Sequence, residues 1–120
     1  MENVAVIGAS PKPDRYSYKA MRMLEECGHT PIPVAPALKE VLGYKAYSRL
    51  ALVPDQVRTV TMYVGPARQD QIVEDILKVQ PRRVIFNPGT ENPAVYDRLR
   101  EAGIQVQEAC TLVLLRTGQF

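Results

Sequence analysis

The chain has 120 residues, and its 15 lysines and arginines stand against 13 acidic residues, which leaves a net charge of +2. This near balance argues against nucleic acid or an anionic membrane surface as a partner, and no apolar run reaches the roughly 18–20 residues that cross a bilayer. A chain of this length is expected to form a single domain, residues 1–120, with one core.

The cysteines and the histidine suggest neither a disulfide scaffold nor a metal site. Cys27 and Cys110 lie far apart, without the CxxC or Cys/His spacing of zinc sites, and His29 is the one histidine. Such cysteines are typical of reduced thiols in an intracellular protein, and the acidic N-terminus lacks the pattern of a signal peptide. We therefore expect a cytoplasmic protein without a bound metal.

Short apolar runs alternate with segments of helical period, which is the pattern of an α/β protein with a parallel sheet. The first run, Val4–Ile7, is continuously apolar, as expected of a strand that is covered on both faces. Four further strands are predicted at Thr30–Pro36, Thr59–Val64, Val84–Phe86 and Ile104–Val106.

Three of the segments between these strands show apolar residues at helical spacing. Apolar residues recur every three or four positions within Ala20–Cys27, Ile72–Leu77 and Val95–Ala102, and each pattern predicts a helix with one buried face. Val41–Leu52 predicts either a short strand or a helical turn. The unbroken apolar run Thr111–Leu115 predicts either a closing helix or another strand, because periodicity alone does not separate the two.

The alternation predicts a three-layer α/β fold with a doubly wound, five-stranded parallel sheet of Rossmann type. Numbered along the chain, its strands are expected in the order 3-2-1-4-5. Ligands of such sheets bind beyond the carboxyl ends of the strands, where the strand order reverses, which places the loop Gly8–Tyr18 at the site. Gly8 ends the first strand, and a residue without Cβ permits a tight turn close to a phosphate.

Polar side chains in this loop favour a phosphate-bearing ligand. The helix that follows offers unpaired N–H groups and a positive dipole end. Ser10 and Ser17 can donate hydroxyl hydrogen bonds, and Arg15 can clamp phosphate oxygens. Tyr16 and Tyr18 can stack on adenine or bond phosphate, although core packing explains one of them equally well. The alternative is a plain strand-to-helix turn with solvated charges.

The loop does not match the fingerprint of NAD-binding domains. Counted from Gly8, the second and third glycines of GxGxxG are replaced by Ser10 and Pro13. Lys39 follows the second strand, where NAD requires a carboxylate for its ribose hydroxyl. A cation there suits a ribose with an extra phosphate, which NADP carries at the 2′ position and coenzyme A (CoA) at the 3′ position. NAD is therefore disfavoured.

Several stretches together resemble the small stand-alone CoA-binding proteins. These proteins are similar to the N-terminal CoA-binding domain of succinyl-CoA synthetase α subunits and of ADP-forming acetate–CoA ligases. The resemblance is carried by Val4–Arg15, Gly28–Pro36, Val41–Tyr47, Val60–Pro66 and Glu101–Ile104, which span nearly the whole chain.

The resemblance implies a set of cofactor-binding residues. Those expected to line the pyrophosphate are Gly8, Ala9, Ser10 and Arg15. Those expected beside the adenosine and its 3′-phosphate are Val34, Pro36 and Lys39. Those expected to border the pantetheine arm are Val64, Gly65 and Pro66.

Two departures from the family pattern concern this site. Many relatives read Val-Asn-Pro-Lys after the second strand, whereas here Ala35 replaces the asparagine and the lysine is displaced to Lys39. Many relatives also carry a Glu-His pair shortly after a C-terminal cysteine, and Cys110 lacks it. Cys110 is therefore either a buried structural thiol or, in the sharper hypothesis, a thiol that forms a mixed disulfide with CoA.

These features predict binding without catalysis. The family's ligases act through a phosphorylated histidine on a second domain, which this chain lacks, and His29 lies at the wrong end of the sheet. We expect a non-catalytic carrier, sensor or accessory module for CoA or an acyl-CoA. The alternatives are an interaction scaffold without a ligand and an NADP-dependent oxidoreductase. A homodimer through the apolar C-terminal segment is compatible with the sequence.

The remaining charged clusters are expected to be solvated. Asp70, Glu74 and Asp75 fall on the outer face of the predicted helix around Ile72–Leu77, and Arg82 and Arg83 precede the fourth strand as a pair. Neither group suggests an acid–base site.

Overall fold

The computed structural model describes residues 1–120, and its main sheet has five strands. These strands are β1 (Asn3–Ile7), β2 (Thr30–Val34), β5 (Thr59–Met62), β6 (Arg83–Phe86) and β7 (Gln105–Glu108). The helices are α1 (Tyr16–Glu26), α2 (Asp70–Val79), α3 (Pro93–Glu101) and α4 (Thr111–Arg116). The remaining elements are a hairpin of β3 (Glu40–Val41) and β4 (Tyr44–Lys45) and two short 3-10 helices, Leu50–Leu52 and Pro66–Arg68.

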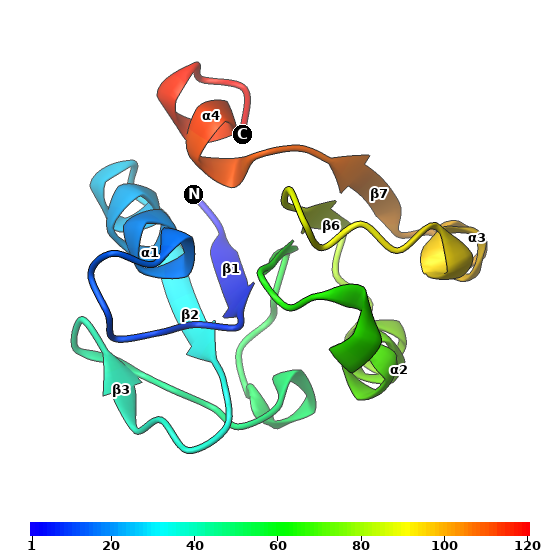
Figure 1. Cartoon of the computed structure of the whole chain (residues 1–120), viewed down its shortest axis with the longest axis horizontal. Helices are drawn as coiled ribbons and strands as arrows, with labels where there is room; N and C mark the ends of the chain where they lie inside the picture. Colours follow the sequence, from blue (N-terminus) through cyan, green and yellow to red (C-terminus); the bar gives the residue numbers. More distant parts are fainter.

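Helices cover both faces of the sheet, whose neighbouring strands are all parallel (Figure 1). Along β1, Val4 and Val6 pack in the core under α1 and α4, whereas Ala5 and Ile7 pack in the larger core under α2 and α3. Successive side chains of a strand point to opposite faces, so a strand between two helical layers is apolar at every position. The predicted three-layer α/β fold with a five-stranded parallel sheet is confirmed.

The predicted strand order is wrong. The observed order is β2-β1-β5-β6-β7, which is 2-1-3-4-5 when the strands of the sheet are numbered along the chain. β5 pairs with β1 rather than with β2, so β2 is an edge strand.

Two prolines explain why no strand lies outside β2. The Tyr47 N–H donates to the Pro33 carbonyl at 3.0 Å from the outer side, whereas the Val34 carbonyl accepts from Gly8 on the inner side. Pro31 has the same parity as Pro33, and therefore the outer edge lacks N–H donors at both positions. Proline is confined to edge strands for this reason.

The connection between β2 and β5 contains both structures that the sequence left open. Val41–Leu52 forms part of the β3–β4 hairpin and then the 3-10 helix Leu50–Leu52, and between them Tyr47 forms a single bridge to Val34. The apolar run Thr111–Leu115 is helical and lies within α4. No helix in the structure has the length and apolar character needed to span a membrane.

Asp75 of α2 anchors this connection, so the expectation that it is solvated is wrong. Its side chain is only 2 % exposed and accepts hydrogen bonds from Arg49 Nη2 at 2.7 Å, Arg49 Nε at 3.3 Å and the Ala51 N–H at 3.2 Å. Burial alone would raise the pKa of Asp75, but these bonds and one from Gln71 outweigh burial and lower it. The carboxylate therefore joins α2 to the 3-10 helix Leu50–Leu52.

At the amino ends of the strands, Phe120 packs against Arg83 and His29. The guanidinium carbon of Arg83 lies 4.3 Å from the centroid of the Phe120 ring, and the His29 ring lies 4.9 Å from it. Arg83 Nε also donates to Thr59 Oγ1 at 2.9 Å. The Arg83 side chain is 14 % exposed, so the prediction of a solvated arginine pair is wrong for Arg83. Burial lowers the pKa of His29.

Candidate functional site

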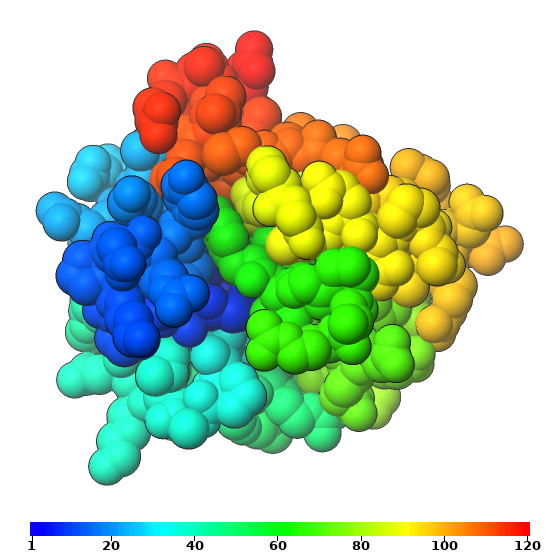
Figure 2. Space-filling view, viewed as in Figure 1, coloured from blue at the N-terminus to red at the C-terminus, as the bar shows by residue number.

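The strand order reverses between β1 and β5, and the loops that follow these two strands meet there. From β1 the sheet continues outward to β2, and from β5 it continues to β6 and β7. Ligands of doubly wound sheets bind at this reversal, beyond the carboxyl ends of the strands. Figure 2 shows the segments after β1, β5 and β6, coloured blue, green and yellow, side by side on one face of the molecule.

Two hollows flank Gly8 at this place. The first, of about 450 Å³, is here called the polar hollow, and its lining includes Gly8, Ser10, Lys12, Arg15, Tyr16, Ser17, Tyr63 and Thr90. The second, of about 220 Å³, is called the apolar hollow, and its lining includes Gly8, Val34, Pro36, Leu50, Val64, Arg68 and Ile72. The reversal point therefore offers two adjoining surfaces of opposite character.

Gly8 joins the two loops and has no room for a side chain. Its φ is +89°, and a Cβ atom there would lie 3.2 Å from the carbonyl carbon and oxygen of Tyr63 and 3.0 Å from Val64 Cγ2. The Gly8 N–H donates to the Val34 carbonyl at 2.9 Å. The glycine is thus required by packing between the β1 and β5 loops, in addition to any approach by a ligand.

The amino end of α1 supplies donors to the polar hollow. The N–H groups of Tyr16, Ser17 and Tyr18 donate to no group of the chain, and no side chain caps the helix. Lys12 and Arg15 line the same hollow and form no ion pair. Unpaired N–H groups, the helix dipole and two cations together favour an anion.

The loop that carries Lys12 is held by a local hydrogen bond. Ser10 Oγ accepts from the Lys12 N–H at 3.1 Å, and its hydroxyl hydrogen stays free to donate to a ligand. The Arg15 N–H then donates to the Lys12 carbonyl at 3.1 Å. The structure therefore brings together five of the predicted site residues, namely Gly8, Ser10, Arg15, Tyr16 and Ser17.

A buried polar network lies beside the polar hollow, and the sequence analysis missed it. Asn87, just after β6, donates through Nδ2 to Thr61 Oγ1 and to the Met62 carbonyl, both at 2.8 Å, and accepts from the Thr111 N–H at 2.8 Å. The Thr61 and Thr111 hydroxyls are 2.7 Å apart. The network ties β5, β6 and α4 together. The sequence did offer a signal for this network: Thr61 and Asn87 are polar residues in or next to buried strands, where side chains of this kind need hydrogen-bond partners.

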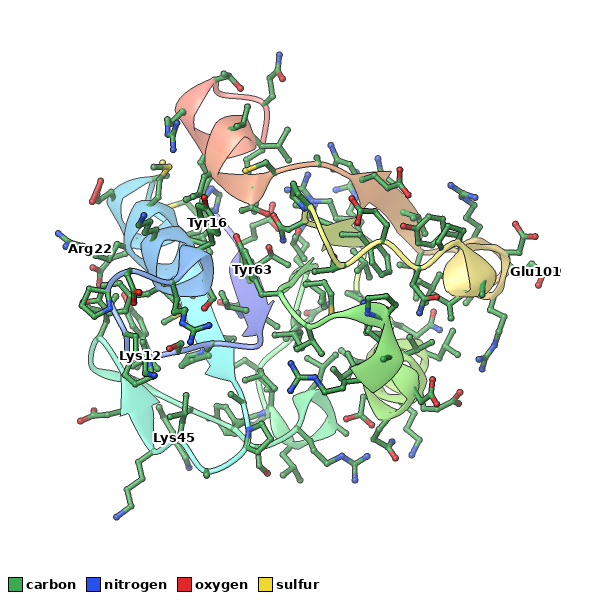
Figure 3. The ribbon with its side chains drawn as sticks, viewed as in Figure 1. Lys12, Tyr16, Arg22, Lys45, Tyr63 and Glu101 are labelled. Carbon is green, nitrogen blue, oxygen red and sulfur yellow. The ribbon has the colours of Figure 1, made fainter.

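Tyr63, which follows β5, has a buried hydroxyl without a hydrogen-bond partner. The residue lies beside α1 (Figure 3) and packs against the core that contains Met21 and Leu24 of this helix. Burial raises its pKa to about 12, an effect that the Thr61 and Thr111 hydroxyls partly oppose. These two hydroxyls belong to the Asn87 network, and the Tyr63 hydroxyl forms no hydrogen bond of its own with either.

The apolar hollow lies between the end of β2 and the start of α2. Val34 and Pro36 from the β2 end meet Val64 from the β5 loop there. The resemblance implied adenosine contacts for the first two and a pantetheine contact for Val64, but all three line one hollow. The sequence analysis missed the two arginines that line this hollow, Arg49 and Arg68, which lie 10 and 29 residues beyond Lys39 in the chain.

Four residues that were expected to bind the cofactor lie outside both hollows, and so does the candidate thiol of Cys110. Ala9 is buried in the core under α1. Gly65 and Pro66 form the start of a 3-10 helix, and Lys39 is exposed beside the β3–β4 hairpin. Cys110 is half-buried at the residue before α4 and lines neither hollow.

Tyr16 and Tyr18 are separated by the start of α1. Tyr16 is 68 % exposed, and Lys19 Nζ lies 5.3 Å from the centroid of its ring. Tyr18 packs partly against the core that also contains Ala9 and Met21. Of the two, only Tyr16 lines the polar hollow.

A larger hollow, of about 620 Å³, lies at the opposite end of the sheet. Its lining includes Asn3, Arg58 and Arg82, at the amino ends of the strands. This is the wrong end for a ligand of a doubly wound sheet. No group of three or more His, Cys, Asp or Glu side chains in the structure is placed to hold a metal ion.

A family model described as a CoA binding domain matches residues 2–116. The protein YneT of Bacillus subtilis (strain 168), described as uncharacterized, is 28% identical over 102 residues, which cover 85% of this chain and 76% of that protein.

Solved structures are similar over 90% or more of the chain. The crystal structure of an uncharacterized protein has 41% identity and a TM-score of 0.93, and the match covers 100% of this chain and 98% of that one. A hypothetical protein from Pyrococcus horikoshii OT3 has 33% identity and a TM-score of 0.85, covering 94% and 81%. A dinucleotide-forming acetyl-coenzyme A synthetase from Ca. Korarchaeum cryptofilum has 23% identity and a TM-score of 0.79, covering 90% and 25%. At this identity the last likeness concerns the fold alone.

Proposed function

The chain belongs to the CoA-binding-domain family, and from this premise we propose that it binds coenzyme A or an acyl-CoA across the two hollows beside Gly8. One observation carries the proposal: the unpaired N–H groups and cations at the start of α1 adjoin an apolar hollow at the end of β2. A nucleotide with a pyrophosphate and an adenine needs this pair of surfaces. A ligand of this kind could be carried, sensed or presented to a separate enzyme.

The fold suggests how CoA lies. Its pyrophosphate faces the free N–H groups of Tyr16, Ser17 and Tyr18, with Lys12 and Arg15 beside it. In dinucleotide-binding sheets the adenosine ribose lies at the carboxyl end of the second strand. The adenosine therefore extends toward the apolar hollow at the end of β2, and the pantetheine arm leaves in the other direction.

The pantetheine arm then crosses the ends of β5 and β6. Tyr63, Pro88 and Thr90 line that side of the polar hollow. In this orientation Val64 lies on the adenosine side of Gly8 rather than along the pantetheine arm. The acyl group of an acyl-CoA would extend beyond Thr90 toward solvent.

We further propose that binding is not accompanied by catalysis. His29 packs against Phe120 at the amino ends of the strands, far from the proposed ligand. Tyr63, whose pKa is raised to about 12, is a poor general base near neutral pH. Ser10 and Ser17 have no base hydrogen-bonded to their hydroxyls. A ligand held by these groups finds donors and cations but no activated nucleophile.

Calorimetric titration with CoA, 3′-dephospho-CoA and NADP tests the proposal. We expect micromolar binding of CoA that weakens in Arg15→Ala, because this variant removes a cation beside the pyrophosphate. Arg22→Ala is the matched control: it removes the same charge from the outer side of α1, away from the hollows (Figure 3). Equal loss in both variants would contradict the proposed position of the pyrophosphate.

The same titration separates the alternatives. Heat with NADP but not with CoA would favour an oxidoreductase. No heat with any of the three nucleotides would favour an interaction scaffold, and a protein partner would then be sought.

A further inference from the structure

Arg68 carries the one charge in the apolar hollow that no neighbour balances. Three charged side chains line this hollow: Arg49, Asp75 and Arg68. Arg49 and Asp75 neutralise each other in an ion pair of 2.7 Å. Arg68 forms neither an ion pair nor a side-chain hydrogen bond, and it is exposed at the edge of the hollow.

The backbone of Arg68 is held in place by its neighbour Gln69. Gln69 is fully buried, and its Nε2 donates to the Val64 and Thr90 carbonyls, both at 2.8 Å. Its Oε1 accepts from Asn92 Nδ2 at 3.0 Å. The Arg68 N–H in turn donates to the Gly65 carbonyl at 3.0 Å. The arginine therefore extends from a rigid turn, and less freedom is lost when it binds a ligand.

We propose that Arg68 binds the phosphate on the adenosine ribose of the nucleotide whose base enters the apolar hollow. The inference rests on the proposed function and names the cation that recognises its distinguishing phosphate. A guanidinium presents two parallel N–H donors to phosphate oxygens, and this geometry suits a terminal phosphate monoester.

The position of Lys39 supports this assignment. Lys39 was expected to hold the 3′-phosphate, but it lines neither hollow, and its carbonyl accepts from the Ala46 N–H at 2.9 Å within the hairpin segment. Lys45 of the same hairpin points outward (Figure 3). The cation at the apolar hollow thus comes from the β5–α2 connection rather than from the β2 loop.

The pair Arg49–Asp75 gives the site a second feature. Asp75 engages Nε and Nη2 of Arg49, which leaves Nη1 free on the side chain that borders the hollow. Asp75 remains neutralised while Arg49 can still donate one bond. Arg68 therefore gives the hollow a net positive charge, and the Asp75 carboxylate, paired with Arg49, does not repel a phosphate there.

Titration of variants with matched nucleotides tests the assignment. The ligands are CoA, 3′-dephospho-CoA and adenosine 3′,5′-bisphosphate, and the variants are Arg68→Ala, Lys39→Ala and the control Arg22→Ala. We expect Arg68→Ala to weaken binding of CoA and of the bisphosphate about tenfold, with little change for 3′-dephospho-CoA. We expect Lys39→Ala and Arg22→Ala to bind all three like the wild type. Thermal unfolding of each variant is the control that checks whether it is folded.

The outcomes separate this inference from the proposed function. If the wild type binds CoA and Arg68→Ala keeps its preference over 3′-dephospho-CoA, the assignment of Arg68 is overturned while CoA binding stands. If Lys39→Ala alone loses that preference, the phosphate belongs to the β2 loop. If the wild type binds the bisphosphate through Arg68 but not CoA, the inference holds and the proposed function fails.

Discussion

A Cβ atom on Gly8 would lie 3.2 Å from the carbonyl carbon of Tyr63. The loops after β1 and β5 can therefore pack this closely only because residue 8 has no side chain. Both loops border the proposed ligand, and the contact between them sets the distance across the site. A change at Gly8 should therefore affect stability and binding together.

We expect Gly8→Ala to lower the free energy of unfolding by about 2–3 kcal/mol, because it adds a contact with rigid backbone to a strained positive φ. Gly43→Ala is the control: its φ is +83°, but a Cβ there meets nothing within 4 Å. The control should lower the free energy of unfolding by about 1 kcal/mol, because an alanine at a positive φ is strained even where its Cβ has room. Urea unfolding measures both, and equal losses would show that the two loops adjust without strain.

Asp75 is expected to make stability depend on pH on the acid side. Burial alone would raise its pKa, but hydrogen bonds from Arg49, Ala51 and Gln71 outweigh burial and hold the pKa below the ordinary value of an aspartic acid. A carboxyl with a lowered folded pKa contributes stability above its unfolded pKa, and that contribution is lost as pH falls through the folded value. The wild type should therefore lose stability below about pH 4, and more steeply than Asp75→Asn, which has no such titration.

Thermal unfolding between pH 2.5 and 7 compares the two proteins. Glu74→Gln is the control, because Glu74 lies next to Asp75 but pairs with Arg98 at the exposed surface. If Asp75→Asn and the wild type show parallel pH profiles, the carboxylate does not anchor the connection as the structure indicates.

The two cysteines should differ in their reaction with CoA disulfide. Cys27 is exposed, whereas Cys110 is half-buried and lines neither hollow. We expect Cys27 to form the mixed disulfide first and Cys110→Ser to bind CoA like the wild type. Mass spectrometry of the treated protein measures the modified sites. Preferential modification of Cys110 at low CoA disulfide would instead support the hypothesis that its thiol faces the bound cofactor.

The sequence predicted the strands better than their order. Continuous apolar runs such as Val4–Ile7 identify buried strands directly, because every position of such a strand faces a helical layer. The order was mispredicted although Pro31 and Pro33 mark an edge strand, since a proline at alternate positions leaves one side without donors. A reading of those two residues would have placed β5 beside β1.

The sequence predicted the site residues that belong to one loop and missed those that come from distant segments of the chain. Ser10, Arg15 and the start of α1 belong to one loop, and the strand–glycine–helix pattern locates them together. Arg68 and the Arg49–Asp75 pair come from distant segments, and their meeting depends on how the β2–β5 connection folds. No local pattern reveals such a contact.

Replacing Tyr63 with phenylalanine is expected to stabilise the protein. Its hydroxyl is buried without a hydrogen-bond partner, and an unpaired buried polar group costs about 1–3 kcal/mol. Tyr63→Phe should therefore raise the free energy of unfolding by about 1 kcal/mol. Tyr63 lines the polar hollow, but its hydroxyl oxygen is buried and offers no contact to a ligand, so CoA affinity should not change. Tyr16→Phe, at an exposed ring, should leave stability unchanged.

The pH dependence of the difference in stability between Tyr63→Phe and the wild type gives a second test. Burial raises the pKa of Tyr63 from 10.0 to about 12. A group with a raised folded pKa contributes stability below its unfolded pKa, and this contribution is lost as pH rises through the folded value. The stability advantage of Tyr63→Phe over the wild type should therefore grow between pH 10 and 12. Urea unfolding at several pH values in this range measures the difference. A constant difference over that range would show that the phenol ionises as freely in the folded protein as in the unfolded chain.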